Sequence, residues 1–157
     1  MLEDSTFDAG IELRRQMFGE AGADGQIYAT TELNDKLQEI VTRWCFGEMW
    51  VREELPLKTR SMITVAMLLA LGRGPELNIH MRGALANGVT DVELREIALH
   101  SILYCGIPAG VEGIRTLDGI LADVAPGSAL REDAARSGRA RPRKTRAKDV
   151  AAASGGD

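Results

Sequence analysis

The segment "SMITVAMLLALG", residues 61–72, constrains the fold more than any other part of the chain. From Met62 to Leu71 it is apolar on nearly every side of a helix, and a helix of this kind is normally central and covered by other elements. We therefore expect a core helix with neighbours on all its sides. The segment is too short to cross a bilayer, which takes ~20 apolar residues. Gly72 is placed to end the helix, because glycine accepts the left-handed conformation that closes many helices.

The rest of the chain predicts further helices and no sheet. Apolar and polar residues rarely alternate, and β-branched residues do not cluster as they do in strands. Apolar residues instead recur at helical spacing. The expected helices cover residues 4–20 (ended by Gly19, Gly22 and Gly25), 31–45 (with an apolar stripe of Leu33, Leu37, Ile40, Val41 and Trp44), 57–71, 91–104 and 109–124 (with a stripe of Val111, Ile114, Leu117 and Leu121). A further helix bears His80: the chain turns into it at Gly74 and Pro75, and Asn87 and Gly88 end it.

Local signals place the ends of these helices. Pro56 suits the first turn of the core helix, where a missing N–H costs nothing. Thr90 and Glu93 form the pattern of a capping box, in which each residue bonds the backbone N–H of the other. Short joints between the helices complete the pattern of an all-α protein. We expect a bundle of about six helices.

Charge and composition divide the chain in two. With 157 residues, 45% of them hydrophobic, the chain can build one domain with a core. Residues 131–157 contain eight Lys and Arg against four Asp and Glu, a net charge of +4, and the rest carries −8. This basic segment has almost no large apolar residues, so we expect a domain over 1–126 and a disordered tail over 127–157. An acidic body is not typical of a nucleic-acid-binding domain, although weak contact of the tail with RNA or an acidic partner stays open.

The two cysteines and the N-terminus indicate a reduced, cytoplasmic protein that does not bind a membrane. Cys45 and Cys105 lie far apart and form no C-x-x-C pattern. We expect both to be small buried residues rather than nucleophiles, because free cysteine is usually buried. The first residues have no basic segment followed by an apolar one, so they do not read as a signal peptide.

His80 is the strongest candidate for a catalytic group. It lies in "GPELNIHMRGALANGVT" with Glu76 four residues earlier, and residues four apart share one face of a helix. A neighbouring carboxylate raises the pKa of an imidazole and orients it, so the pair can act as a general acid. A simple ion pair on the helix surface is the alternative. His80 and His100 are twenty residues apart and match no zinc-binding spacing, so we expect no metal.

Other residues are weaker candidates. Arg60, at the start of the core helix, can bind a substrate carboxylate through two parallel hydrogen bonds, or it can pair with Glu53 or Glu54. Trp44 and Trp50 can line a pocket or fill the core.

We expect His100, which follows Leu99 on an amphipathic helix, to be packed or to lie at an interface.

Several short motifs together resemble the carboxymuconolactone decarboxylase family, in particular the γ-carboxymuconolactone decarboxylases of aromatic catabolism. The matching pieces are "KTRS", "ALGR", "ELNIH", "ALANGVT", "ELREIALH" and "YCGIPA", in this order, from about Trp44 to Arg115. The resemblance implies an all-helical, AhpD-like fold. It also implies a ring-shaped homo-oligomer, commonly a hexamer made as a trimer of dimers, and a decarboxylase without a cofactor.

The resemblance also gives roles to particular residues. His80 falls on the histidine of the family motif E-L-x-x-H, which is the family's proton donor, and Glu76 falls on its glutamate. Alkylhydroperoxidase-type relatives carry C-x-x-C before the corresponding histidine. Here those two positions hold Arg73 and Glu76, so thiol chemistry is not expected.

The expected reaction converts 4-carboxymuconolactone to the β-ketoadipate enol-lactone. Loss of CO₂ leaves an electron pair that the ring double bond passes to the lactone carbonyl, so the substrate is its own electron sink. His80 then gives a proton to the dienolate, and the expected substrate contacts are Arg60, Trp44, Trp50 and Tyr104. The alternatives are a same-fold enzyme acting on another lactone or β-keto acid, and a non-catalytic interaction module.

Overall fold

The computed structural model describes residues 5–28 and 30–123, and within them the protein is all-α, as expected. The elements in chain order are the α-helices α1 (Ser5–Tyr28) and α2 (Asp35–Ile40), the π-helix η1 (Val41–Trp50), and the α-helices α3 (Leu57–Leu71), α4 (Gly74–Ala86), α5 (Asp91–Cys105) and α6 (Ile107–Asp123). None of the described helices is long and apolar enough to span a membrane. The expected tail over 127–157 lies outside the described residues.

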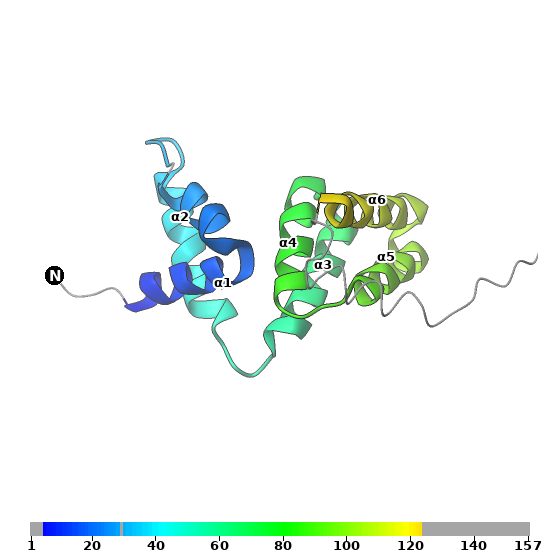
Figure 1. Cartoon of the computed structure of the whole chain (residues 1–157), viewed down its shortest axis with the longest axis horizontal. Coiled ribbons are helices and arrows are strands. Elements are labelled where there is room, and N and C mark those ends of the chain that lie inside the picture. The colour runs from blue at the N-terminus through cyan, green and yellow to red at the C-terminus, as the bar shows by residue number, and fades with distance from the viewer. Residues whose placement is uncertain (1–4, 29, 124–157) are drawn as a thin grey trace, which may run out of the picture.

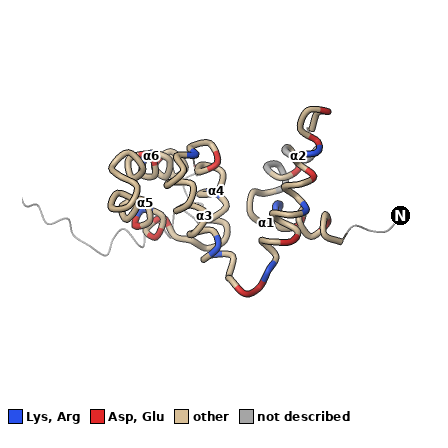
Figure 2. Tube along the Cα trace, turned by 180° about the vertical axis from the view of Figure 1, so that it is seen from behind, with Lys and Arg blue, Asp and Glu red and all other residues tan. Residues whose placement is uncertain are grey.

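The helices form two groups that meet at α1 and α4 (Figure 1). Helices α1, α2 and η1 pack on one another, and α3 to α6 form the second group. Residues 51–56 join the groups, and Figure 2 shows acidic and basic residues along this linker. Helix α1 also contacts α4. The residues between the two groups therefore come from parts of the chain that are distant in sequence.

Helix α3 provides part of the core of the second group, but it is not covered on all sides, so that expectation was wrong. Val65 and Leu69 are buried against α4, α5 and α6. On the opposite face, Ile63, Met67 and Leu71 are 44%, 52% and 69% exposed. Helices α4, α5 and α6, which make the main contacts with α3 among the described residues, leave these three side chains exposed.

The N-terminal group departs from the expected helices in two places. Gly19, with φ of 74° and ψ of 160°, breaks the opening helix as expected, but a second helical segment, which the sequence did not predict, follows the kink within α1 and reaches Tyr28. The expected helix over 31–45 is instead the short α2 followed by η1.

The expected apolar stripe over 31–45 was wrong at three positions, and the π-helix accounts for the one that lies in it, Trp44. Leu33, Leu37 and Trp44 are exposed. In a π-helix the backbone hydrogen bonds join residues five apart, so the buried face advances more slowly along the chain than in an α-helix. The buried residues are accordingly Thr42, Phe46, Gly47 and Trp50.

Two glycines let α1 and η1 cross closely. A Cβ atom on Gly10 would overlap the carbonyl oxygen of Thr42, and one on Gly47 would overlap the carbonyl oxygen of Thr6. Each glycine therefore faces the backbone of the opposite helix. This contact fixes how far Thr42 and its neighbours on η1 stand from α1.

Glycines also shift the buried face of α6. The expected stripe began at Val111, but the structure buries Gly110, Gly113, Leu117 and Ile120 and leaves Val111 exposed. A Cβ atom on Gly113 would lie 2.7 Å from the Cβ of Ala98, so α5 approaches α6 where side chains are smallest. Hydrophobic spacing alone did not include glycines as packing positions.

The helix ends mostly follow the sequence signals. Gly72 closes α3 with φ of 64°, and the capping box is present at the start of α5. The backbone N–H of Thr90 donates to Glu93 Oε2 at 2.8 Å, and the N–H of Glu93 donates to Thr90 Oγ1 at 3.1 Å. Pro56 is the residue before the first turn of α3 rather than within it.

Thr90→Ala is expected to lower the free energy of unfolding by about 1 kcal/mol, because the Glu93 N–H loses its acceptor. Urea titration measures this change. Thr59→Ala is the matched control: Thr59 is exposed inside α3, where alanine has the better helix propensity. Equal changes in the two variants would contradict a capping role for Thr90.

Candidate active site

A small cavity lies where the two groups of helices meet. Its volume is about 140 Å³, and its lining comes from α1, α2, η1 and α4: Arg14, Phe18, Gln38, Val41, Phe46, Glu76, Ile79 and His80. Sites for drug-sized ligands usually span ~300–1,000 Å³. This cavity therefore suits a compact molecule.

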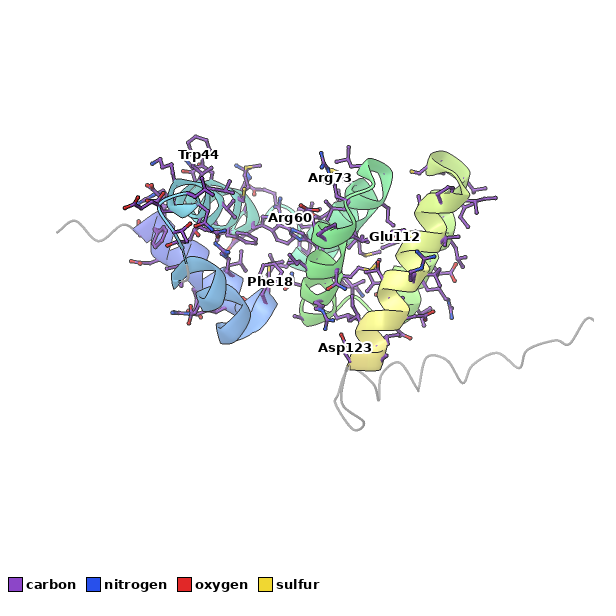
Figure 3. The ribbon with its side chains drawn as sticks, turned by 90° about the horizontal axis from the view of Figure 1, so that it is seen from above. Phe18, Trp44, Arg60, Arg73, Glu112 and Asp123 are labelled. Atoms are coloured by element: carbon purple, nitrogen blue, oxygen red, sulfur yellow. The ribbon has the colours of Figure 1, made fainter. Side chains whose placement is uncertain are left out.

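His80 lies in this cavity between two aromatic rings. Its ring is edge-on to Phe18, with centroids 6.0 Å apart, and stacks on Trp50, with centroids 6.1 Å apart. Figure 3 shows Phe18 in the region between the two groups of helices. The Nδ1 atom of His80 is buried and has no hydrogen-bond partner among the described residues. A buried nitrogen of this kind is uncommon unless it serves a ligand or a reaction.

Burial controls the charge of His80. It lowers the pKa of the imidazole below its ordinary value of 6.5, and the negative charge of Glu76 opposes this effect without overcoming it. The expectation that Glu76 raises the pKa was therefore wrong in its net direction. The resting imidazole favours its neutral form.

Glu76 is exposed beside the same cavity. In the described part of the chain it forms neither a hydrogen bond nor an ion pair with His80, so the surface ion pair that the spacing allowed is also absent. Its effect on His80 acts through space, as negative charge on the same helix. An orienting contact between the two side chains is not formed in this structure.

Sequence analysis missed Arg14, which supplies a cation to the cavity wall. Its side chain is 1% exposed. Its guanidinium donates to Thr42 Oγ1 at 2.7 Å and to Gln38 Oε1 at 3.1 Å, and it lies 5.5 Å from the centroid of the Phe46 ring. One signal was present in the sequence: Arg14 lies three residues after Ile11 and four before Phe18, which places it on the apolar face of α1.

The expected substrate contacts lie in different places. Trp50 is buried behind His80. Trp44 and Tyr104 are 60% and 78% exposed and do not line the cavity of His80. Their assignment as substrate contacts stays a prediction.

Arg60 lies beside the linker and does not form the expected pair with Glu53 or Glu54. Its Nη2 donates to the carbonyl oxygen of Arg52 at 3.2 Å, and Arg52 itself pairs with Glu54. The Nε of Arg60 is buried without a hydrogen-bond partner in the described residues. Figure 3 shows Arg60 in the region between the two groups of helices. Its role as a substrate contact stays a prediction.

A second, larger hollow of about 730 Å³ lies along α3 and α5, and His100, Tyr104 and Cys105 line it. His100 is exposed, and within the described residues its ring contact is with Tyr104, with centroids 5.1 Å apart, so in a single chain it is not a packed residue. Cys45 and Cys105 are also exposed, and the expectation of burial was wrong. Cys45 lies on η1 and Cys105 on α5, on helix faces that the other described elements do not cover.

The lowered pKa of His80 predicts that the fold loses stability as pH falls. Between 6.5 and the lowered value, the unfolded chain binds a proton at His80 that the folded chain does not. The free energy of unfolding should therefore decrease as pH falls from 7.5 towards 5.5, and His80→Gln should flatten this dependence. Urea titrations at several pH values measure it. His100→Gln, on an exposed residue, is the control, and an equal flattening by both variants would contradict the assignment to His80.

The fold and cavity define an all-α protein with a half-buried histidine at the junction of two groups of helices. The model of the carboxymuconolactone decarboxylase family matches residues 35–118, and the chain belongs to this family. It is 36% identical over 124 residues to a 4-carboxymuconolactone decarboxylase of Acinetobacter baylyi, which covers 79% of this chain and 92% of that protein. It is also 36% identical over 108 residues to a nitrosuccinic acid decarboxylase of Metarhizium robertsii, which covers 69% of this chain and 76% of that protein.

Proposed function

We propose that the protein is a decarboxylase that acts without a cofactor on 4-carboxymuconolactone and forms the β-ketoadipate enol-lactone, as in aromatic catabolism. The observation that carries this proposal is His80, an imidazole whose buried Nδ1 has no partner in the described part of the chain, in a small cavity that is also lined by the buried Arg14. The named relatives support a carboxy-lyase.

The substrates named for the two relatives share a pattern that explains why no cofactor is needed. In 4-carboxymuconolactone, the carbon that loses CO₂ is conjugated through a double bond to the lactone carbonyl. In nitrosuccinic acid, the same kind of carbon carries a nitro group. Each molecule accepts its own electron pair when the C–C bond breaks. The protein has to bind the acid, exclude water and deliver one proton.

His80 delivers that proton in the proposed reaction. The resting imidazole favours the neutral form because it is buried. A substrate with two carboxylates brings negative charge close to the ring, and such charge raises the pKa of an imidazole. His80 therefore takes up a proton as the substrate binds and gives it to the α-carbon after CO₂ has left. Glu76 adds negative charge beside the cavity and favours the same proton uptake.

Turnover of a panel of acids tests the proposal. The purified protein is expected to release CO₂ from 4-carboxymuconolactone with a higher kcat/KM than from a β-keto acid. In heavy water, the product should carry deuterium on one face of the α-carbon only. A preference for nitrosuccinate would support the second candidate, a nitro-acid decarboxylase, which the 36% identical relative favours. No turnover of any of these acids would support the non-catalytic interaction module instead.

We also propose the ring-shaped homo-oligomer that the family resemblance implies, commonly a hexamer. The exposed apolar residues on α3 support it, because soluble proteins usually cover such surfaces.

The double variant Cys45→Ser, Cys105→Ser is expected to keep wild-type kcat with 4-carboxymuconolactone. Both thiols are exposed, and neither lines the cavity of His80. Steady-state kinetics measure this, and circular dichroism checks that the variant is folded. A folded double variant without activity would indicate a thiol mechanism.

A further inference from the structure

We propose that Arg14 binds the carboxylate that the substrate keeps, and that it selects acids with a second carboxylate two carbons from the first. This inference rests on the proposed function, because it assigns a part of the substrate to a residue of the same cavity. Arg14 lies on α1, and His80 lies on α4. The residues that line the cavity bring the two groups together.

The position of Arg14 is set by the N-terminal group. Its guanidinium donates to Thr42 Oγ1 and Gln38 Oε1, and the Thr42 hydroxyl in turn donates to the carbonyl oxygen of Gln38. Thr42 and Gln38 are neutral groups, so these two bonds orient the guanidinium without neutralising its charge. A planar guanidinium held in this way is suited to binding a carboxylate through two parallel bonds.

Burial makes an anionic ligand favourable at Arg14. Its surroundings lower the pKa of the guanidinium, mainly through burial, which means that the apolar environment disfavours the charge. An entering carboxylate compensates a buried positive charge more strongly than it would at the surface, because the effective dielectric is lower there.

Aromatic rings connect Arg14 to His80. The guanidinium lies over Phe46, the Phe46 and Phe18 rings meet edge-on with centroids 5.8 Å apart, and Phe18 is edge-on to His80. An acid held by one carboxylate at Arg14 therefore has its other end against apolar rings and the imidazole. A carboxylate that loses its hydration there is the one placed to leave as CO₂.

The two acids named for the relatives have the same arrangement. In 4-carboxymuconolactone and in nitrosuccinic acid, the carbon that loses CO₂ also bears a CH₂–COO⁻ group. Each molecule thus contains a succinate unit, with one carboxylate that leaves and one that stays. Their electron sinks differ, so the retained carboxylate is the feature that a common anchor can recognise.

Binding of succinate and of its diamide, succinamide, which has no carboxylate, tests the anchor without requiring turnover. Trp50 stacks on His80, so its fluorescence can report binding, and calorimetry provides the affinities. We expect the wild type to prefer succinate about 10–100-fold, as for a hydrogen-bonded ion pair. Equal binding of the two compounds, or no saturable binding of either, would overturn the proposal, and this measurement needs no variant.

Variants identify the residue that causes the preference for succinate. Arg14→Gln should remove it, and Arg14→Lys should keep a part of it. Gln38→Ala, which leaves Arg14 in the chain, should reduce it several-fold, so the test does not depend on one variant folding. The matched control is Arg15→Gln: Arg15 pairs with Asp24 and does not line the cavity, so the preference should be unchanged. Loss of the preference in Arg60→Gln, with none in folded Arg14→Gln, would overturn the proposal.

Turnover separates this proposal from the proposed function. If 4-carboxymuconolactone is not decarboxylated but the succinate preference depends on Arg14, the function is wrong and the anchor stands. If the lactone is decarboxylated and folded Arg14→Gln keeps the wild-type KM for it, the anchor is wrong and the function stands.

Discussion

His80→Asn is expected to lower kcat for 4-carboxymuconolactone by ~10²–10⁴-fold, with a smaller change in KM. Asparagine keeps a hydrogen-bond donor of similar reach but cannot transfer a proton. Steady-state kinetics provide both parameters, and a melting curve verifies that the variant is folded. Because the ring packs between Phe18 and Trp50, part of any loss of stability belongs to packing. Kinetics are therefore measured well below the melting temperature.

His100→Asn is the matched control for this experiment, since His100 is exposed and lines the other hollow. It should keep wild-type kcat. Near wild-type turnover in folded His80→Asn would show that His80 is not the proton donor. Deuterium on both faces of the α-carbon in the wild-type product would lead to the same conclusion.

Gly10→Ala and Gly47→Ala are each expected to lower the free energy of unfolding by about 1–3 kcal/mol, the usual cost of overpacking. The added methyl group meets a backbone carbonyl, of Thr42 or of Thr6, and backbone cannot rotate away as a side chain can. Urea titration measures the change. Activity should fall as well, because Thr42 accepts a hydrogen bond from Arg14.

Gly119→Ala provides a control of opposite sign. Gly119 lies in α6, and a Cβ atom there meets nothing within 4 Å. Alanine is the better helix former by roughly 0.5–1 kcal/mol, so this variant should be more stable than the wild type. Destabilisation of the same size in all three variants would show that the close crossing of α1 and η1 is not the cause.

The sequence predicted the parts of the site that lie on one helix. Glu76 and His80 are four residues apart on α4, and the helix that was expected between Pro75 and Asn87 is present as Gly74–Ala86. Arg14 was missed because it stands beside Arg15 in a polar segment, which looks like a solvated surface. Whether a charged side chain is buried depends on which helix packs on it, and the contacts of Arg14 come from α2 and η1, which lie more than twenty residues further along the chain.

The same reason explains the errors in the fold. The sequence predicted α3 to α6 from a continuous apolar run, from turn and capping residues and from apolar residues at helical spacing. Helical spacing failed for η1, because a π-helix has a different period. The sequence also could not show that α3 is covered on one side only. Met67 is an apolar residue in the sequence whether or not a neighbouring helix covers it in the fold.

The neutral resting state of His80 has a consequence for the end of each catalytic cycle. In the proposed reaction the substrate enters with two negative charges, and the product keeps one. The imidazole has by then given up its proton and has returned to the form that burial favours. The product therefore loses one of the two attractions that held the substrate. Decarboxylation and proton transfer therefore weaken binding of the product. We expect accumulated product to compete only weakly with new substrate for the cavity.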